Sequence, residues 1–332
     1  MIDNQEKVLV TGASGYIALH CISELIKNNY KVKASLRDLS RVNEVTTALK
    51  NEDIEFCQLD LLNDNGWEEA ASDCDYILHI ASPFKIEEPK NEDSFIKPAL
   101  EGTLRALKAA KKASVKKIVL TSSMASIAYG HNKKVCNKDD WTDITKDVGA
   151  YIKSKTIAEK AAWNFIKEQD ENQLVMTTIH PGMVFGPLLS DDKDGASASL
   201  IMNMINGKFP AIPDVFFTVV DVRDIAKLHI QSLKNTNSDN KRIIATSQNG
   251  ISFLKISEIL RELGYIKSPT ALIPNQVINS MAPFNKEMRN TAAMIKRGCY
   301  GSDVEETRQI YNWIPIPLKK TLKDMTDSLK VS

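Results

Sequence analysis

Short apolar runs alternate with segments of helical spacing through the first half of the chain. Residues 7–10 have the unbroken apolar character of a buried strand, and further strands are expected over 31–36, 54–59, 76–80 and 117–120. Between them, apolar residues recur every three or four positions, most clearly over 16–27 and 93–112. Pro98 predicts that the second of these helices bends or starts late. Strands that alternate with helices in this way predict a parallel sheet covered on both faces.

The second half begins with the same alternation and then becomes irregular. A helix is expected over 151–168, and a sixth strand over 174–179 ends at His180-Pro181-Gly182. Residues 191–199 are rich in Asp, Ser, Ala and Gly, which predicts a flexible loop. The later expected elements are two returns to the sheet and one helix, at 219–232, 241–245 and 251–263.

Composition and charge exclude several classes of protein. The 332 residues are 43% hydrophobic and 26% charged, as in an ordinary globular protein, and the net charge of +1 argues against a nucleic-acid partner. No apolar run approaches the roughly 18 residues that a membrane span needs, and no secretory signal is evident, so we expect a cytoplasmic protein without membrane attachment. The five cysteines are scattered and lack CxxC spacing, so we expect neither a disulfide framework nor a metal site.

A glycine-rich turn, Thr11-Gly12-Ala13-Ser14-Gly15, lies between the first expected strand and the first helix. Backbone N–H groups at a helix N-terminus attract a pyrophosphate, because that end of the helix carries partial positive charge and unpaired donors. Gly12 permits the tight turn, Gly15 lets the backbone approach the phosphates, and Ala18 lets the helix pack near the strand. We therefore expect a dinucleotide to contact the turn and the start of the helix, at Thr11, Gly12, Ser14, Gly15, Tyr16 and Ile17.

Strand, turn and helix together predict an α/β fold of the Rossmann type. In this fold a doubly wound parallel sheet binds the dinucleotide, and we expect a smaller, mainly C-terminal α/β lobe to bind the substrate. The expected dinucleotide-binding domain covers 1–180 plus about 219–246, and the expected lobe covers 181–218 plus 247–332.

The end of the second strand bears on the choice between NADPH and NADH. Arg37 follows that strand, and a guanidinium group can bind the 2′-phosphate of NADPH in bidentate fashion. Asp38 would favour NAD if it pointed inward instead. We favour NADPH/NADP as the cofactor.

Two further turns at strand ends are expected beside the cofactor. Asp60 and Leu61 follow the third strand, where the carboxylate can accept the adenine amine; alternatively, Asp60 only caps a helix that begins near Asn63. Ala81 and Ser82 follow the fourth strand and are expected beside the nicotinamide ribose. His79 lies within an apolar run and is expected in the core rather than in catalysis.

Tyr151 and Lys155 are four residues apart on an expected helix and therefore share one of its faces. A nearby ammonium group lowers the pKa of a phenol by favouring the phenolate, and the positive charge of an oxidised nicotinamide would add to this effect. Lys155 could also hold the ribose hydroxyls of the cofactor. A hydroxyl that polarises a substrate carbonyl is expected from Ser123, with Ser122 as the alternative because adjacent side chains alternate along a strand. This set of residues predicts proton transfer to a small carbonyl compound.

In combination, Thr11-Gly12-x-x-Gly15-x-x-Ala18, Ser123, Tyr151 and Lys155 resemble the extended short-chain dehydrogenases/reductases. The finer pattern is similar to the branch of dihydroflavonol 4-reductase, cinnamoyl-CoA reductase and yeast methylglyoxal (ketone) reductase. Its marks lie within the first 190 residues: Leu36-Arg37-Asp38, Asp60-Leu61, His79-x-Ala81-Ser82-Pro83, Leu120-Thr121-Ser122-Ser123, Tyr151-x-x-Ser154-Lys155 and His180-Pro181-Gly182-x-Val184-x-Gly186-Pro187.

The resemblance implies roles for particular residues. Tyr151 would be the general acid, Lys155 would tune it, and Ser123 would donate to the carbonyl oxygen. Further cofactor contacts are expected from Thr121, Pro181, Gly182 and Val184. Two departures from the family argue against a bulky flavonoid or CoA-linked substrate: a shorter segment between Ser123 and Tyr151, and His180 in place of the usual arginine.

The expected activity is therefore the NADPH-dependent reduction of an aldehyde or ketone to an alcohol, by a monomer or a homodimer. A nucleotide-sugar epimerase of the same superfamily and a non-catalytic NADP-binding protein remain as alternatives. An epimerase usually favours NAD, which Arg37 argues against, and a binding protein would be expected to lose Tyr151 or Lys155. A dehydratase would need an acid after Ser123, where Met124-Ala125 stand. The walls of the substrate pocket are expected from Phe84, 128–149, 183–189 and the C-terminal lobe.

Overall fold

The computed structural model describes most of the 332 residues. The described residues are 5–51, 53–83, 89, 91–169, 174–191, 195–247, 249–285, 288–289, 291–292 and 299–331.

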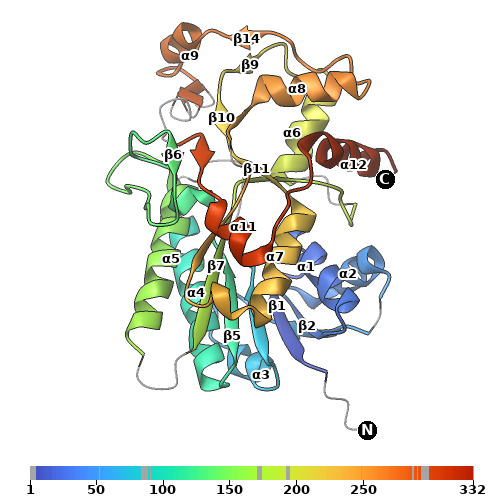
Figure 1. The fold of residues 1–332 in the computed structure, drawn as a ribbon, viewed down its shortest axis with the longest axis vertical. Coiled ribbons are helices and arrows are strands. Elements are labelled where there is room, and N and C mark those ends of the chain that lie inside the picture. Colours follow the sequence, from blue (N-terminus) through green and yellow to red (C-terminus); the bar gives the residue numbers. More distant parts are fainter. Residues whose placement is uncertain are drawn as a thin grey trace.

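A seven-stranded sheet forms the centre of the larger part of the molecule, and every pair of neighbouring strands in it is parallel (Figure 1). Its order is β12-β7-β5-β4-β1-β2-β3. The strands are β1 (Lys7–Thr11), β2 (Lys31–Leu36), β3 (Glu55–Gln58), β4 (Tyr76–His79), β5 (Lys117–Thr121), β7 (Val175–Pro181) and β12 (Arg242–Ala245). Because β1 pairs with β2 on one side and with β4 on the other, the order of strands reverses between β1 and β4. Ligands of open α/β sheets bind at such a reversal, outside the carboxyl ends of the strands.

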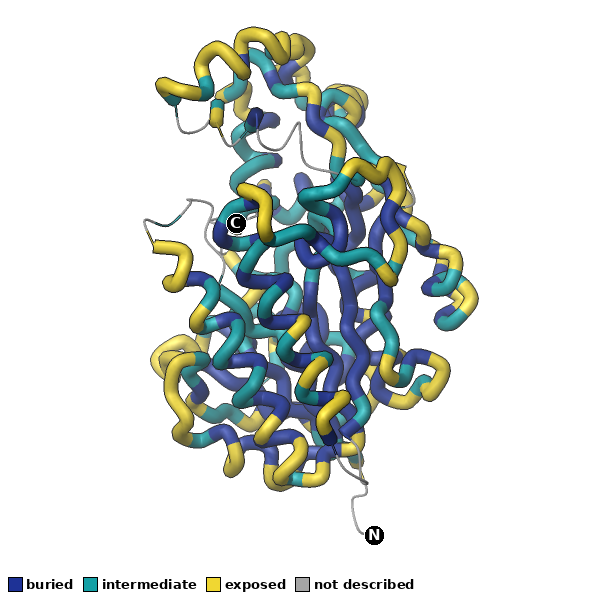
Figure 2. The backbone as a smooth tube through the Cα atoms, turned by 90° about the vertical axis from the view of Figure 1, so that its left-hand side faces the viewer, coloured by how far each residue is buried: buried dark blue, intermediate teal, exposed yellow. Residues whose placement is uncertain are grey.

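Helices cover both faces of this sheet, as its apolar strands require, since β1, β4 and β5 consist almost entirely of buried residues. On one face lie α1 (Tyr16–Lys27), α2 (Val42–Leu49) and α7 (Val222–Lys234), whose buried side chains share a core with β1 and β2. On the other lie α3 (Trp67–Ala71), α4 (Asp93–Lys112) and α5 (Ala150–Lys167), which share a second core with β4 and β5. The buried stretches of the chain accordingly concentrate along the strands in Figure 2.

A smaller lobe stands beyond the carboxyl ends of the strands, at the top of Figure 1. Its core joins α6 (Ala196–Ile205), α8 (Phe253–Glu262) and α12 (Leu318–Val331). Among the described residues, four two-stranded sheets are also present, each a short pairing of distant segments. They pair β8 (Met183–Phe185) with β11 (Val219–Asp221), β10 (Phe216–Phe217) with β13 (Ile251–Ser252), β9 (Ile212–Pro213) with β14 (Leu272–Ile273), and β6 (Val135–Cys136) with β15 (Gly301–Ser302).

The remaining helices in the part of the chain that the structure describes are short. They are α9 (Asn275–Met281), α11 (Glu305–Tyr311) and the single 3₁₀ turns η1 (Leu39–Arg41), η2 (Met124–Ser126) and η3 (Thr236–Ser238). Tyr311 and Trp313 pack into the core beneath the large sheet although their segment was assigned to the lobe. The boundary between the two domains stays a prediction.

The α/β fold class and the parallel Rossmann-type sheet are confirmed, and two local predictions are wrong. A third is wrong in part: helix α4 does not start late at Pro98, because its buried face packs on α3 and α5. A bend of the helix at Pro98 stays a prediction. Helix α6 begins at Ala196, inside the predicted loop, because Ala198 and Ile201 bury against the lobe core. The segment 219–232 pairs with β8 as β11 and then continues as helix α7, so it does not return to the large sheet.

Two observations bear on the expectations from composition. In the part of the chain that the structure describes, no helix is long and apolar enough to cross a membrane. A disulfide joins Cys136 and Cys299, whose Cα atoms lie 5.9 Å apart. This bond was not expected from the sequence, in which 163 residues separate the two cysteines.

Candidate active site

The glycine-rich turn lies at the reversal point of the sheet. Gly12 has a φ of +71°, a left-handed conformation, and a Cβ atom there would lie 3.0 Å from the Cα of Ala81 at the end of β4. Gly15 precedes α1, and no side chain caps that helix N-terminus. The first N–H groups of a helix have no partners within the helix, so donors for an anion are available here. These residues offer backbone donors for an anion, and their contact with a dinucleotide pyrophosphate stays a prediction.

Thr11 has a structural task that sequence reasoning missed. Its Oγ1 accepts hydrogen bonds from the backbone N–H groups of Ile80 and Ala81, both at 3.0 Å, and lies 3.0 Å from Nδ1 of His79. The hydroxyl therefore fixes the β4 turn against the glycine-rich turn. His79 is buried, as predicted, and burial lowers its pKa to about 3.

The start of α1 is joined to the loop after β8. The Tyr16 hydroxyl donates to the carbonyl of Gly186 at 2.8 Å, and His20 contacts the carbonyl of Pro187 at 2.9 Å. The phenol of Tyr16 is thus occupied, and Ile17 packs against the core beneath α1 and α2. Ser14 lies half-buried on the turn itself. In this stretch the backbone is better placed than the side chains to meet phosphate groups.

The end of β2 presents one guanidinium group to solvent. Arg37 is exposed and makes no salt bridge with another residue of the described chain. Asp38 instead turns its carboxylate onto the backbone N–H of Ser40 at 2.9 Å, where it caps η1. Arg41 is held by Glu44 through two hydrogen bonds of 2.8 Å. Of these residues, Arg37 is therefore the one suited to a 2′-phosphate.

Asp60 stabilises a turn and not a helix. Its Oδ1 accepts from the N–H of Leu62 at 2.9 Å, whereas α3 begins later, after Gly66. The alternative of a helix cap near Asn63 is therefore wrong. Leu61 packs so closely on Gly102 of α4 that a Cβ there would lie 2.4 Å from the leucine Cδ2.

Ala81 and Ser82 lie half-buried at the end of β4, across from the glycine-rich turn. Phe84, expected in the substrate pocket, lies outside the described residues.

The hydroxyls that follow β5 divide between two tasks. Ser123 shares a side-chain hydrogen bond with Tyr151, and its Oγ also accepts from the N–H of Ala125 at 3.1 Å. Ser122 points away and donates to Glu159 at 2.6 Å. Of the two serines, Ser123 is therefore the one beside the phenol.

The protein by itself raises the pKa of Tyr151. Burial is the main cause, Tyr129 adds to it, and the hydrogen bond with Ser123 acts in the opposite direction. A phenol in these surroundings keeps its proton at neutral pH, which is the state that a proton donor requires.

Lys155 is buried four residues further along α5. Its Nζ donates to the carbonyl of Thr121 at 3.1 Å, which ties α5 to the end of β5. Burial lowers the pKa of Lys155 to about 8, and the Glu159 carboxylate works against this shift. The hydroxyl of Thr121 lies 2.8 Å from Nε2 of buried His229, so Thr121 has its backbone carbonyl and not its side chain at the site.

A buried carboxylate behind these residues was missed by sequence reasoning. Glu159 is 1% exposed and follows Lys155 by four positions, so Tyr151, Lys155 and Glu159 share a face of α5. Its closest donors are Ser126 Oγ at 2.5 Å, Ser122 Oγ at 2.6 Å, Arg242 Nε at 2.7 Å and His180 Nε2 at 2.8 Å. Burial acts to raise the pKa of Glu159, but His180 and Arg242 hold it well below its usual range. The helical spacing was the signal that could have found it.

His180 and Arg242 reach the same carboxylate from neighbouring strands. His180 is fully buried in β7, and burial lowers its pKa. Arg242 comes from β12, and its guanidinium also lies 3.8 Å from the ring centre of Trp141. Arg242 thus brings a guanidinium group to the Glu159 carboxylate, although residue 180 itself is a histidine.

The end of β7 requires a residue without a side chain. A Cβ on Gly182 would lie 2.4 Å from the carbonyl oxygen of Thr218, and the neighbouring N–H of Met183 donates to that oxygen at 2.8 Å. Pro181 ends β7, and Val184 lies half-buried in β8. These residues belong to the same edge of the sheet as Thr121 and Ser123.

The comparison with protein families decides where the chain belongs. Residues 8–245 match the model of the NAD dependent epimerase/dehydratase family. This protein is a member of that family. Among curated proteins it is 36% identical to "Cinnamoyl-CoA reductase CAD2" of Medicago truncatula, over 77% of this chain and 80% of that protein. It is 32% identical to "NADPH-dependent methylglyoxal reductase GRE2" of Saccharomyces cerevisiae, over 77% of this chain and 82% of that protein.

Solved structures extend the likeness to the whole chain. The yeast methylglyoxal/isovaleraldehyde reductase Gre2, complexed with NADPH, superposes with a TM-score of 0.81 at 25% identity, over 97% of this chain and 98% of that one. A UDP-glucose 4-epimerase from Thermotoga maritima has a TM-score of 0.76 at 20% identity, over 98% of this chain and 99% of that one, and so shares the fold alone. The family member is thus an extended short-chain dehydrogenase/reductase of the branch named from its sequence, and an NAD(P)-dependent oxidoreductase.

Proposed function

We propose that this protein reduces an aldehyde or a ketone to the corresponding alcohol with NADPH. The observation that carries the proposal is the hydrogen-bonded pair of Ser123 and Tyr151 at the sheet edge that also holds the Gly12 turn. Bound NADPH supplies the hydride that reduces the carbonyl carbon.

The side chains of the site supply the proton and hold the carbonyl. Ser123 donates a hydrogen bond to the carbonyl oxygen and so fixes it beside the phenol. Tyr151 gives its proton to that oxygen as the carbon is reduced, and the product is the neutral alcohol. The positive charge of Lys155 then stabilises the phenolate that Tyr151 has become, until solvent returns the proton.

The order of events fits the pKa values of the two groups. Tyr151 begins protonated because burial raises its pKa. Lys155, with a pKa of about 8, is largely charged at neutral pH and loses its charge above that value. We therefore expect turnover to decline above about pH 8, with Lys155 as the group that titrates.

The preference for NADPH over NADH is assigned to Arg37. Two observations support it: Arg37 is exposed at the end of β2, and the neighbouring Asp38 is engaged with Ser40. Asp38 therefore does not point inward, where its carboxylate would bind the ribose hydroxyls and favour NADH.

The test is a carbonyl screen with the purified protein. Absorbance of the reduced cofactor is followed with a panel of aldehydes and ketones, and NADH is run in parallel with NADPH. The proposal expects oxidation of NADPH that depends on the added carbonyl and yields one alcohol per cofactor. Tight cofactor retention without net oxidation would favour an epimerase, and cofactor binding without any turnover would favour a binding protein; either result overturns the proposal.

A further inference from the structure

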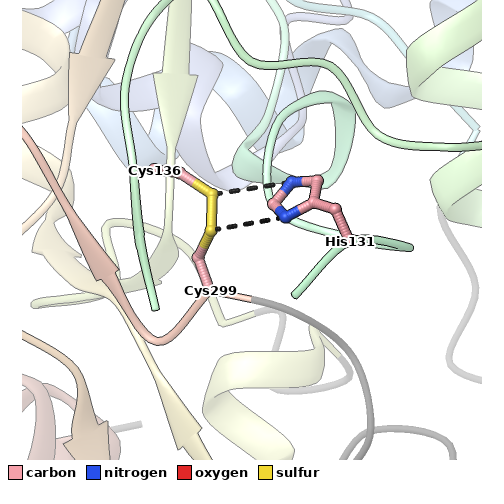
Figure 3. Close-up of side chains that lie close together, drawn as sticks. All are labelled: His131, Cys136 and Cys299. Atoms are coloured by element: carbon pink, nitrogen blue, oxygen red, sulfur yellow. Dashed lines mark hydrogen bonds between the residues drawn. A yellow bond between two sulfur atoms is a disulfide. The ribbon is translucent and has the colours of Figure 1, made fainter. Parts of the chain in front are cut away.

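Cys136 and Cys299 form a disulfide at the base of the substrate lobe, with the ring of His131 beside both sulfurs (Figure 3). The imidazole nitrogens lie 3.7 Å from Sγ of Cys136 and 3.9 Å from Sγ of Cys299. This cluster has no part in the proposed reduction, and it lies apart from the cofactor turns. It joins two segments that are 163 residues apart in the sequence.

The two sulfurs differ in their access to solvent. Cys136 is fully buried in β6, whereas Cys299 and His131 are half-buried. The three remaining cysteines make no disulfide, and burial raises the pKa of each. Of the two disulfide cysteines, Cys299 is therefore the one that a reagent from solvent reaches first.

Hydrogen bonding fixes the orientation of the His131 protons. Nε2 lies 2.9 Å from the carbonyl of Ile127, which can only accept, so neutral His131 carries its proton on Nε2 and donates it there. Nδ1 then presents its lone pair, and it is the nitrogen that faces Cys299. A base is thus directed at the more accessible of the two sulfurs.

We propose that Cys136 and Cys299 are a reversible thiol–disulfide pair, that His131 activates Cys299, and that a low-molecular-weight disulfide is the oxidant. In the reduced pair, the Cys299 thiol gives its proton to Nδ1 of His131, and the thiolate attacks one sulfur of the small disulfide. That disulfide breaks and releases one thiolate, which takes up a proton, and Cys299 is left in a mixed disulfide.

Cys136 completes the exchange. The Cys136 thiol loses its proton, the resulting thiolate attacks the Cys299 sulfur of the mixed disulfide, and the second small thiolate leaves and takes up that proton. The protein loses two electrons in forming one S–S bond, and the small disulfide gains them as two thiols. An excess of small thiol reverses both steps.

The pair controls how the C-terminal segment is held against the segment before the catalytic helix. The N–H groups of Tyr300 and Gly301 donate to the carbonyl of Lys134. The N–H of Asp303 donates to the backbone carbonyl of Cys136 at 2.7 Å. Opening the disulfide leaves these backbone contacts as the main tie between β6 and β15.

Tyr129 links this region to the proposed proton donor. Its ring packs against the cluster that contains Cys136 and Val304, and also against the cluster of Ala125, Val148 and Ile152, on which Tyr151 packs as well. Resting on the proposed function, we infer that reduction of the disulfide loosens the wall beside Tyr151 and weakens carbonyl binding, while the cofactor turns stay as they are.

The experiment compares the protein incubated with oxidised glutathione and with reduced glutathione, followed by acid quenching, alkylation of the unfolded chain in denaturant, and mass measurement. The sequence has five cysteines, so the reduced protein should take up five alkyl groups and the oxidised protein two fewer. We expect the KM for a carbonyl substrate to rise about fivefold or more on reduction, the lower end of ordinary coupling between sites, with the KM for NADPH unchanged. His131→Gln should form the same disulfide at least about tenfold more slowly, because it lacks the base.

Matched variants separate this pair from general thiol effects. Cys136→Ser and Cys299→Ser should each lose the response to glutathione, whereas Cys57→Ser, which alters a half-buried unpaired cysteine on β3, should keep it. If no carbonyl is turned over, the proposed function fails, and this inference is then judged by alkylation and by faster amide exchange of residues 300–303 in the reduced protein.

Three results would overturn the inference. The first is an alkylation count that does not change between the two forms of glutathione. The second is a count that changes while neither the carbonyl KM nor the amide exchange moves. The third is stoichiometric zinc in the reduced protein that blocks oxidation, since His131 and the two thiolates would then be metal ligands.

Discussion

Replacing Glu159 by Gln removes one negative charge from the interior and keeps the shape of the side chain. The carboxylate is 1% exposed, and the side chain of Arg242 that pairs with it is 10% exposed. The substitution therefore leaves a guanidinium in the interior without its counter-charge. It also removes the oxygen that accepts from Ser122 and Ser126, the two serines on either side of the Ser123 turn.

The expected loss of unfolding free energy is about 3 kcal/mol. Breaking a buried ion pair by removing one partner ordinarily costs about 3–5 kcal/mol. The lower end of this range applies because Arg242 keeps its hydrogen bonds to the carbonyls of Lys138 and Asp140 and its contact with the ring of Trp141. We also expect kcat to fall about tenfold or more, since a shift of about 1 Å in a positioned group can cost about 10²-fold.

Urea unfolding and steady-state turnover measure the two effects. Glu168→Gln is the matched control, because Glu168 is exposed near the end of the same helix and should change stability by less than about 0.5 kcal/mol. Combining Glu159→Gln with Arg242→Met should recover part of the stability, since no charge is then left unpaired. The reasoning would be refuted if Glu159→Gln were as stable as the Glu168→Gln control, or if the double variant were less stable than Glu159→Gln alone.

Three further predictions concern the cofactor and acid stability. Arg37→Ala should raise the KM for NADPH about tenfold or more, the usual worth of charged hydrogen bonds, and should change that for NADH about twofold or less; equal losses would argue against a 2′-phosphate contact. Gly12→Ala places a Cβ in a left-handed turn and 3.0 Å from a backbone atom, so it should lower thermal stability and weaken NADPH binding in titration, and a neutral effect would contradict the described turn. His20, His79 and His229 are buried with pKa values of about 4, 3 and 4, so below pH 6.5 the unfolded chain takes up protons that the folded protein does not. Stability should therefore fall from pH 6.5 towards pH 4, by up to about 1.4 kcal/mol per histidine and pH unit, and a flat stability profile between pH 7 and 5 would contradict this.

The large sheet and the glycine-rich turn could be predicted well from the sequence, because both depend on local signals. Short segments rich in apolar residues between helical patterns indicated the strands, and the region 31–36 was predicted with its observed bounds. A glycine with positive φ at the end of a strand leaves a recognisable motif, as at Gly12.

The parts that sequence reasoning missed depend on contacts between distant residues. Glu159 meets Arg242 across 83 positions, and Cys136 meets Cys299 across 163 positions, so neither pair has a local pattern. The choice between Ser123 and Ser122 was open for the same reason, because it depends on which hydroxyl faces Tyr151 and which faces Glu159, both on α5. Pro98 failed as a helix boundary because burial along α4 outweighs the cost of one proline.

The central claim is that the Tyr151 phenol gives its proton to the reduced carbonyl. The most direct measurement is kcat for Tyr151→Phe, together with the dissociation constant of NADPH from the same preparation. The phenyl ring keeps the packing and removes only the hydroxyl that bonds Ser123. We predict that kcat falls by about 10²–10⁴-fold, the usual contribution of a positioned acid, while NADPH binding changes about threefold or less. A variant that retains most of its turnover would contradict the account.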